Sequence, residues 1–108
     1  MELSPEDAKL VTLARASRAR TAAAEGAAVR DLDGRTYAAS TVALDSLQIA
    51  ALDLAVAMAV SSSAKGLEAA AVVTETDSPA ITAVRDLSDG INVYVADTTG
   101  AVGSVLQS

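Results

Sequence analysis

The chain has 108 residues and a formal net charge of −6, which fits one acidic domain and opposes binding to nucleic acid or to anionic membranes. It contains no histidine and no cysteine, which excludes the usual zinc sites, Cys–His pairs and Ser–His–Asp triads. Apolar residues make up 51% of the chain but aromatic residues only 2%. We therefore expect a thin core of Ala, Val, Leu and Ile that would gain from oligomerisation.

A first helix is predicted from Ser4 to about Arg18. Ser4 and Pro5 form the pattern of a helix N-cap followed by proline at the first helical position. Small or apolar residues recur at helical spacing and predict its buried face; they are Leu10, Val11, Leu13, Ala14 and Ser17. The basic residues near its end are expected to be solvated; they are Arg15, Arg18 and Arg20. The acidic start of the chain does not resemble a secretory signal, so we expect a cytoplasmic location.

A β-hairpin follows, with strands predicted over 27–32 and 35–39. Asp33 and Gly34 lie between them and supply the left-handed turn residues that such a hairpin needs.

A second helix is predicted to begin near Leu47, after a loop over 41–46. Asp45 or Ser46 is its expected N-cap. The helix is apolar on nearly all sides to about residue 60, which is typical of a helix buried between layers or between subunits. Asp53 is the exception, and we expect its carboxylate to reach solvent or to pair with an arginine, including one from another subunit.

The C-terminal part begins with a segment over 67–74 that contains an uninterrupted apolar run over 69–73. This run predicts a strand covered on both faces, at the centre of a sheet. Ser78-Pro79 repeats the cap-then-proline pattern and predicts a short helix that Gly90 ends. A strand over 91–95 and a weak last segment over 101–106, at the edge of the sheet, complete the chain. This order predicts a single α/β domain over residues 1–108, with a mixed sheet and helices on both faces.

Several of these segments resemble the cytidine deaminase family, including its blasticidin deaminase relatives. The stretch from Gly26 to Tyr37 is similar to the family's first hairpin, with a Gly-Ala-Ala strand start and an Asp-Gly-Arg turn. Residues 55–61 resemble the second half of its zinc-bearing helix, and Ser78-Pro79 stands where the family has Pro-Cys-x-x-Cys. The resemblance covers most of the chain. It implies a three-layer α/β/α cytidine deaminase-like fold whose mixed sheet has about four to five strands and starts with a β-hairpin.

In that family a Cys or His, a Glu two residues later and two further Cys hold the zinc and move the proton. The resemblance places these four chemical positions on aliphatic side chains: the three ligand positions are Ala50, Ala80 and Ala83, and the glutamate position is Leu52. The family's ribose-binding Asn and Glu correspond to Thr41 and Ala43. The resemblance thus implies a degenerate member without a metal, a cofactor or catalytic residues.

Three hypotheses about function are open at this point. The first, which we favour, is a non-catalytic interaction or regulatory module with an unknown protein partner. The second is a nucleoside-binding protein whose relic ligand pocket would contain Thr41, Ala43 and Asp45. The third is an enzyme with a rebuilt, zinc-independent site, for which Mg²⁺ would need carboxylates; the candidates are Asp45, Asp53, Glu75 and Asp77.

The resemblance also implies a homo-oligomer, because deaminases of this type form dimers or tetramers that pack through the central helix layer. An alanine-rich second helix would allow two copies to approach closely. Asp53 is a candidate assembly residue, since it interrupts this apolar helix.

Overall fold

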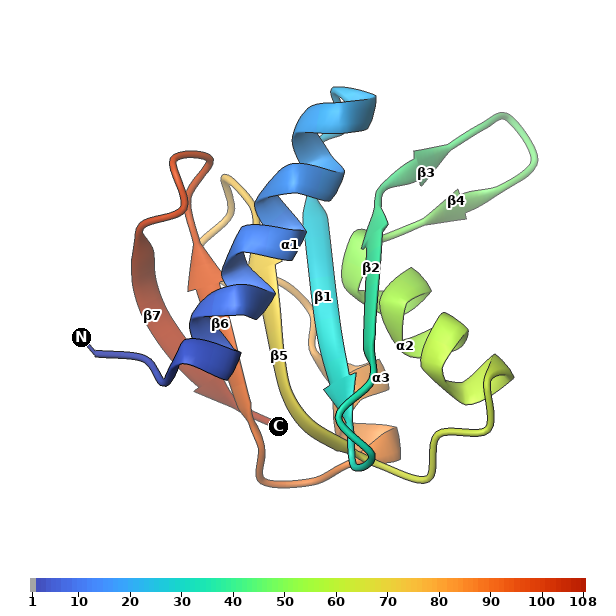
Figure 1. The fold of residues 1–108 in the computed structure, drawn as a ribbon. Coiled ribbons are helices and arrows are strands. Elements are labelled where there is room, and N and C mark those ends of the chain that lie inside the picture. Colours follow the sequence, from blue (N-terminus) through green and yellow to red (C-terminus); the bar gives the residue numbers. More distant parts are fainter. Residues whose placement is uncertain (1) are drawn as a thin grey trace.

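Residues Leu67–Val73, which end in an apolar run, form β5, the central strand of a five-stranded sheet. The computed structural model describes residues 2–108, and its sheet has the order β2-β1-β5-β6-β7 (Figure 1). The other strands of this sheet are β1 (Gly26–Asp31), β2 (Thr36–Ser40), β6 (Asn92–Ala96) and β7 (Val102–Gln107). Only β5 and β6 pair in parallel; the remaining neighbours are antiparallel. The predicted central strand, opening hairpin and edge position of the last strand are confirmed.

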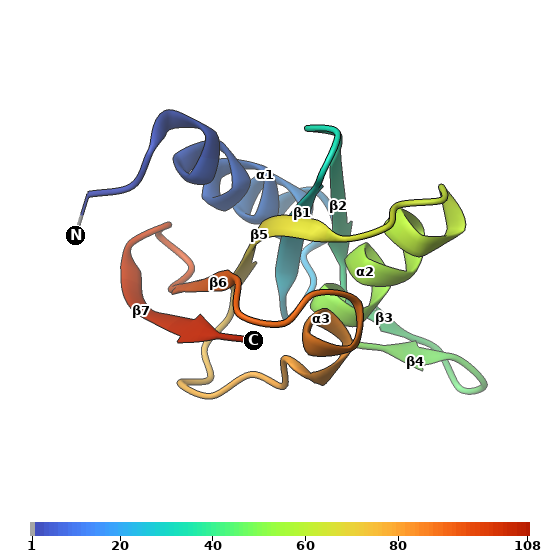
Figure 2. The same cartoon turned by 90° about the horizontal axis from the view of Figure 1, so that it is seen from below.

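Helices cover both faces of the sheet, as Figure 2 shows from below. The three helices are α1 (Pro5–Thr21), α2 (Ala51–Ser61) and α3 (Thr82–Leu87). Successive residues of β1 point to opposite faces, so Ala27 and Val29 pack in the core beneath α2 and α3, whereas Ala28 packs beneath α1. The three-layer α/β/α architecture and the mixed sheet are therefore as predicted.

Helix α1 begins as its sequence predicts. The Ser4 hydroxyl accepts a hydrogen bond from the Asp7 backbone N–H at 3.1 Å, which satisfies one of the free donors of the first turn. The helix rests closely on the start of β1, because a Cβ atom at Gly26 would lie 2.0 Å from the backbone oxygen of Ala14. Only glycine allows this approach.

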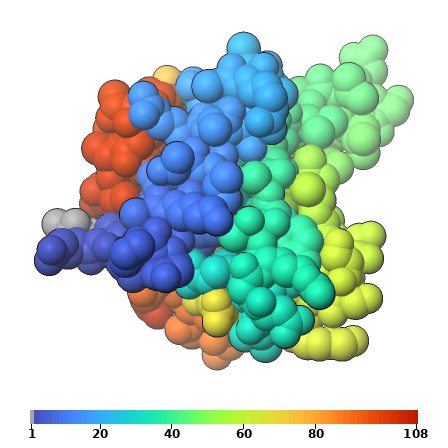
Figure 3. Space-filling view, in the orientation of Figure 1, coloured from blue at the N-terminus to red at the C-terminus, as the bar shows by residue number. Residues whose placement is uncertain are grey.

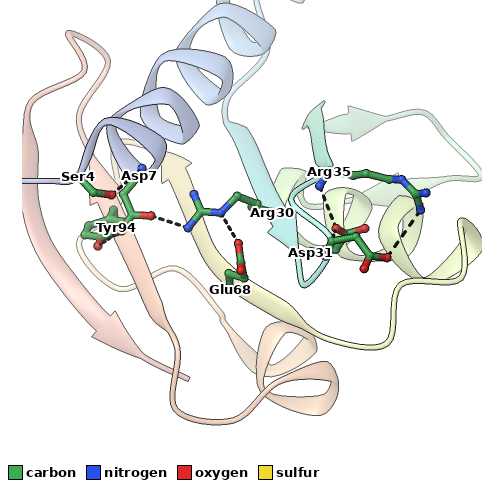
Figure 4. Close-up of polar contacts among 8 residues, drawn as sticks. Ser4, Asp7, Arg30, Asp31, Arg35, Glu68 and Tyr94 are labelled. Carbon is green, nitrogen blue, oxygen red and sulfur yellow. Dashed lines mark hydrogen bonds and ion pairs between the residues drawn. The ribbon is translucent and has the colours of Figure 1, made fainter.

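A polar cluster ties the first turn of α1 to three strands of the sheet (Figure 4). Arg30 on β1 contacts Asp7 at 2.9 Å and Glu68 on β5 at 2.7 Å. The Tyr94 hydroxyl on β6 donates to Asp7 as well, and this bond, together with burial, raises the pKa of Tyr94. The Arg30 and Asp7 side chains are only 15% and 16% exposed, so their charges stabilise each other where water reaches them poorly.

The segment before α2 differs from its prediction. Residues 42–49 form a small hairpin of β3 (Val42–Ala43) and β4 (Gln48–Ile49), which projects from the body of the protein (Figures 1 and 3). Leu44 and Leu47 exchange backbone hydrogen bonds around a tight turn at Asp45 and Ser46. The prediction that Asp45 or Ser46 caps the helix was therefore wrong. Both residue types favour turns as well as caps. Here the backbone hydrogen bonds between Leu44 and Leu47 favour the turn.

The start of α3 also differs from its prediction. The helix begins at Thr82, and its N-cap is Ile81, which makes no side-chain cap hydrogen bond. Ser78-Pro79 lies several residues earlier, in the connection from β5. A cap-then-proline pattern marks where a helix can start, and here the chain continues as a loop before it turns. No helix among residues 2–108 has the length and apolar character needed to cross a membrane.

Candidate functional site

The four positions that the resemblance assigns to zinc chemistry lie at the starts of α2 and α3, on one face of the sheet. Leu52 is 2% exposed and belongs to the main hydrophobic cluster. Ala83 is half-buried and packs against the same cluster. Ala50, the N-cap residue of α2, and Ala80 are exposed. The structure thus brings Leu52 and Ala83 into shared core and leaves the other two at the surface.

None of these four side chains can bind a metal, because alanine and leucine carry no donor atom. Zinc in proteins needs three or four nitrogen, sulfur or oxygen ligands. Within residues 2–108 there is no group of three or more His, Cys, Asp or Glu side chains that could hold a metal ion. The donor set of this chain therefore does not fit the zinc of the resembled family.

The residues of the expected relic pocket lie between the end of β2 and the turn of the projecting hairpin. The Thr41 hydroxyl accepts a hydrogen bond from the Glu25 N–H at 2.9 Å and donates one to the Glu25 backbone oxygen at 3.3 Å. It therefore ties the end of β2 to the start of β1. Ala43 lies exposed on β3, and Asp45 is exposed at the turn of the projecting hairpin.

Asp53 lies exposed in the first turn of α2. A carboxylate at this position interacts favourably with the positive end of the helix dipole. Among the ion pairs formed within residues 2–108, none involves Asp53. Its side chain thus reaches solvent in a single copy of the chain.

Two of the other carboxylates in the rebuilt-enzyme hypothesis border a cavity of about 590 Å³. Glu75 and Asp77 line it from the connection after β5, and Asp97 lines it from the end of β6. Hydrogen bonds from the Thr99 hydroxyl and from backbone N–H groups lower the pKa of Asp97. A general acid near neutral pH needs a raised pKa, so Asp97 is suited to stabilising its turn and not to proton donation.

The sequence analysis missed Asp31, a buried carboxylate at the end of β1. It is 1% exposed and accepts hydrogen bonds at 2.9 Å from the backbone N–H groups of Asp33 and Arg35 and from the Tyr37 hydroxyl. Figure 4 shows the bond from Arg35. Burial by itself would raise the pKa of Asp31, but these bonds outweigh it and lower the pKa. The bond to Asp31 raises the pKa of Tyr37. An Asp placed two residues before an Asp-Gly turn is the signal that could have revealed this role.

The lowered pKa of Asp31 predicts acid-sensitive stability. A carboxyl whose pKa is depressed by folding stabilises the fold above its unfolded pKa of about 3.9, and this contribution is lost as the pH falls through the folded value. We expect Asp31→Asn to melt below the wild type at pH 7, because an amide cannot accept all three bonds. The difference should shrink in thermal melts taken below about pH 4. A difference that is constant from pH 7 to pH 2 would contradict this account of Asp31.

Comparisons with known proteins agree with this architecture. A family model described as "Cytidine deaminase-like" matches residues 3–100. Among solved structures, the fold is similar to that of a cytidine deaminase from Burkholderia pseudomallei, with 21% identity and a TM-score of 0.74 over 97% of this chain and 93% of that one. No curated protein matches the sequence. Since the family match spans most of the chain and the solved structure shares its fold, this protein belongs to the cytidine deaminase-like family.

Proposed function

We propose that this protein is a catalytically inactive member of its family that acts as a non-catalytic interaction or regulatory module. The observation that carries the proposal is the environment of Leu52. At the position of the family's catalytic glutamate stands a leucine that is 2% exposed and packed in the main hydrophobic cluster. A carboxylate at this position could act in catalysis only if a polar, water-accessible pocket surrounded it.

The remaining chemical positions support the same proposal. Deamination of this type needs a metal-activated water and a residue that moves its proton. Alanine at positions 50, 80 and 83 can provide neither. The domain thus keeps its frame without ligands for a metal, and the apolar core takes over the stabilisation that a metal centre would contribute.

A ligand screen tests the proposal. We expect thermal melts with cytidine, deoxycytidine or uridine, with and without Zn²⁺, to be unchanged, and ammonia release from cytidine to stay at background. A ligand present at about a hundredfold over its Kd would add about 2.7 kcal/mol and raise the melting temperature by roughly ten degrees or more. A nucleoside-selective shift would instead favour a nucleoside-binding protein, and turnover would favour a rebuilt, zinc-independent enzyme.

A positive control makes a negative result informative. The triple variant Ala50→Cys, Ala80→Cys and Ala83→Cys restores sulfur donors at the three ligand positions, and three thiolates suffice to bind zinc. We expect Zn²⁺ to raise the melting temperature of this variant and not that of the wild type. Equal Zn²⁺ responses of the two proteins would mean that zinc binds elsewhere on the chain.

We further propose that the protein forms a homo-oligomer through α2. The outward side of this helix carries apolar residues; Met58 is 38% exposed and Val60 is 52% exposed. A shallow cavity of about 390 Å³ lies beside them, lined by Tyr37, Leu54, Ala57, Met58, Ser61 and Ser62. Neighbouring exposed apolar side chains of this kind mark interaction surfaces. A cytoplasmic location and the absence of nucleic-acid or membrane partners stay predictions from composition.

A charged side chain introduced on the outward side of α2 tests the proposed interface. We expect the wild type to be larger than a monomer by light scattering at micromolar concentration, and Met58→Glu to reduce its size, because the new carboxylate would be buried between copies. Ala16→Glu, at an exposed position of α1, adds the same charge and should leave the size unchanged. Asp53→Ala should disturb assembly or stability. A monomeric wild type would contradict this interface.

A further inference from the structure

The large apolar side chains that are well exposed within residues 2–108 all lie on α2 or next to its two ends. They are Leu32, Leu44, Leu47, Met58 and Val60. Leu44 and Leu47 belong to the projecting hairpin that leads into α2, and both elements lie on the same side of the molecule (Figures 1 and 3). Leu32 lies beside the connection that follows α2, because its N–H donates to the Gly66 oxygen at 3.3 Å. Apolar side chains gathered in this way mark an interaction surface.

The charges at the two ends of this surface are opposite in sign. Asp53 is exposed in the first turn of α2, and Asp45 is exposed at the hairpin turn before it. Lys65 is exposed in the connection that follows the helix. Residues 54–64 between them carry no charge. Among the ion pairs formed within residues 2–108, none involves any of these three charged side chains.

These end charges determine the direction in which two copies of α2 match. If the helices ran parallel, like charges would meet at both ends, which is unfavourable. If they run antiparallel about a twofold axis, the acidic end of each copy meets the basic end of the other. Two whole molecules of net charge −6 repel each other, so a contact between them needs local attraction and an apolar surface. The surface along α2 provides both.

The helix is short enough for one contact to include both ends. Its 11 residues span about 16 Å at 1.5 Å per residue. Residue 59 lies halfway in sequence between Asp53 and Lys65, and the shallow cavity of about 390 Å³ is lined from α2 by residues between 54 and 62. A twofold axis at the middle of this cavity therefore brings Met58 of two copies together. It also brings the hairpin of each copy toward Leu32 of the other.

We propose that a second copy of this chain packs antiparallel along α2, so that Asp53 of each copy pairs with Lys65 of the other. This pairing rests on the homo-oligomer proposed above and gives it a direction and its polar contacts. Because the interface is isologous, each contact occurs twice. Leu44 and Leu47 of each copy then cover Leu32 of the other, which removes these side chains from water.

Charge reversal on separate copies tests the pairing. Asp53→Lys and Lys65→Asp each place like charges at both ends of the interface. We therefore expect sedimentation equilibrium at low salt to show, for each variant alone, a dimer at least about tenfold weaker than that of the wild type. In an equimolar mixture the two variants form a heterodimer with two opposite-charge pairs, so its affinity should return to within about threefold of the wild type. Single variants that dimerise like the wild type, or a mixture that does not recover, would overturn the proposal.

Matched controls separate this pairing from a change in net charge. Glu6→Lys alters an exposed carboxylate in the first turn of α1, and Lys9→Asp alters an exposed lysine of the same helix. They change the net charge as Asp53→Lys and Lys65→Asp do, but away from α2. Neither control should weaken the dimer, and mixing them should add nothing. Controls that weaken the dimer as much as the α2 variants would overturn the pairing of Asp53 with Lys65.

Single cysteines report the direction of the helices, because the chain has no cysteine of its own. A disulfide forms only where two Cα atoms come within about 7 Å. On mild oxidation, Met58→Cys should cross-link with itself, and Asp53→Cys should cross-link with Lys65→Cys in a mixture. Asp53→Cys alone should stay uncross-linked, as should Ala16→Cys at an exposed position of α1. Self-cross-linking of Asp53→Cys would show parallel helices and overturn the proposal.

The outcomes also distinguish this pairing from the α2 interface in general. A dimer that Met58→Glu dissociates but that charge reversal leaves unchanged would keep the α2 interface and overturn the antiparallel pairing. A wild type that is monomeric at micromolar concentration would overturn both. Neither result bears on catalytic inactivity, which the nucleoside melts and the ammonia assay test separately.

Discussion

Leu52→Glu should destabilise the protein strongly, by about 3 to 5 kcal/mol, since it places a carboxylate in the hydrophobic cluster around a side chain that is 2% exposed. For a domain of this size the melting temperature should fall by roughly 15 °C or more. The variant restores the residue type that the family resemblance expects at this position. Its instability would show that the side chains around position 52 no longer accommodate the glutamate that the family has there.

The pH dependence of Leu52→Glu separates buried charge from lost packing. A buried carboxyl has a raised pKa, so the folded variant should regain stability as the pH falls and lose it as the pH rises through that pKa. Leu52→Gln has a similar shape without a charge, and its stability relative to the wild type should vary little with pH. A Leu52→Glu variant that melts within about two degrees of the wild type, a change well under 1 kcal/mol, would mean that position 52 opens into a polar pocket. That result would revive the nucleoside-binding hypothesis.

Gly26→Ala should cost about 3 kcal/mol, at the upper end of the range for overpacked sites. The new Cβ atom would stand 2.0 Å from the Ala14 backbone oxygen and 2.9 Å from the Arg18 backbone nitrogen. Backbone atoms cannot move away by a change of rotamer, so α1 as a whole would have to shift from the sheet. That shift would also strain the contact between Asp7 and Arg30.

Gly103→Ala is the matched control, because a Cβ atom at position 103 meets nothing within 4 Å. Its melting temperature should stay within a few degrees of the wild type, as is usual for open surface positions. Denaturant unfolding of both variants measures the difference. Equal stability of the two variants would show that the approach of α1 to Gly26 does not limit the packing of this fold.

Local patterns predicted most of the architecture. The Ser4-Pro5 start of α1, the Asp33-Gly34 turn and the apolar run in β5 each specify their conformation within a few residues. The order of these elements then predicted a mixed sheet with helices on both faces, and the family resemblance implied the same three layers. The starts of α2 and α3 were predicted wrongly because the same residue pattern occurs in two kinds of local structure. Asp45 and Ser46 can cap a helix or form a turn, and only the pairing of β3 with β4 selects the turn.

The sequence by itself determined that the usual histidine and cysteine ligands of zinc are missing, and that aliphatic residues stand at positions 50, 52, 80 and 83, which the resemblance assigns to zinc chemistry. It could not show that these four positions differ from one another. Only the tertiary structure placed Leu52 in the core and left Ala50 and Ala80 exposed. It likewise brought Asp7, Arg30 and Glu68 together and left β7 as an open edge. Burial and pairing depend on which distant segments meet, and this is decided by the packing of the whole chain.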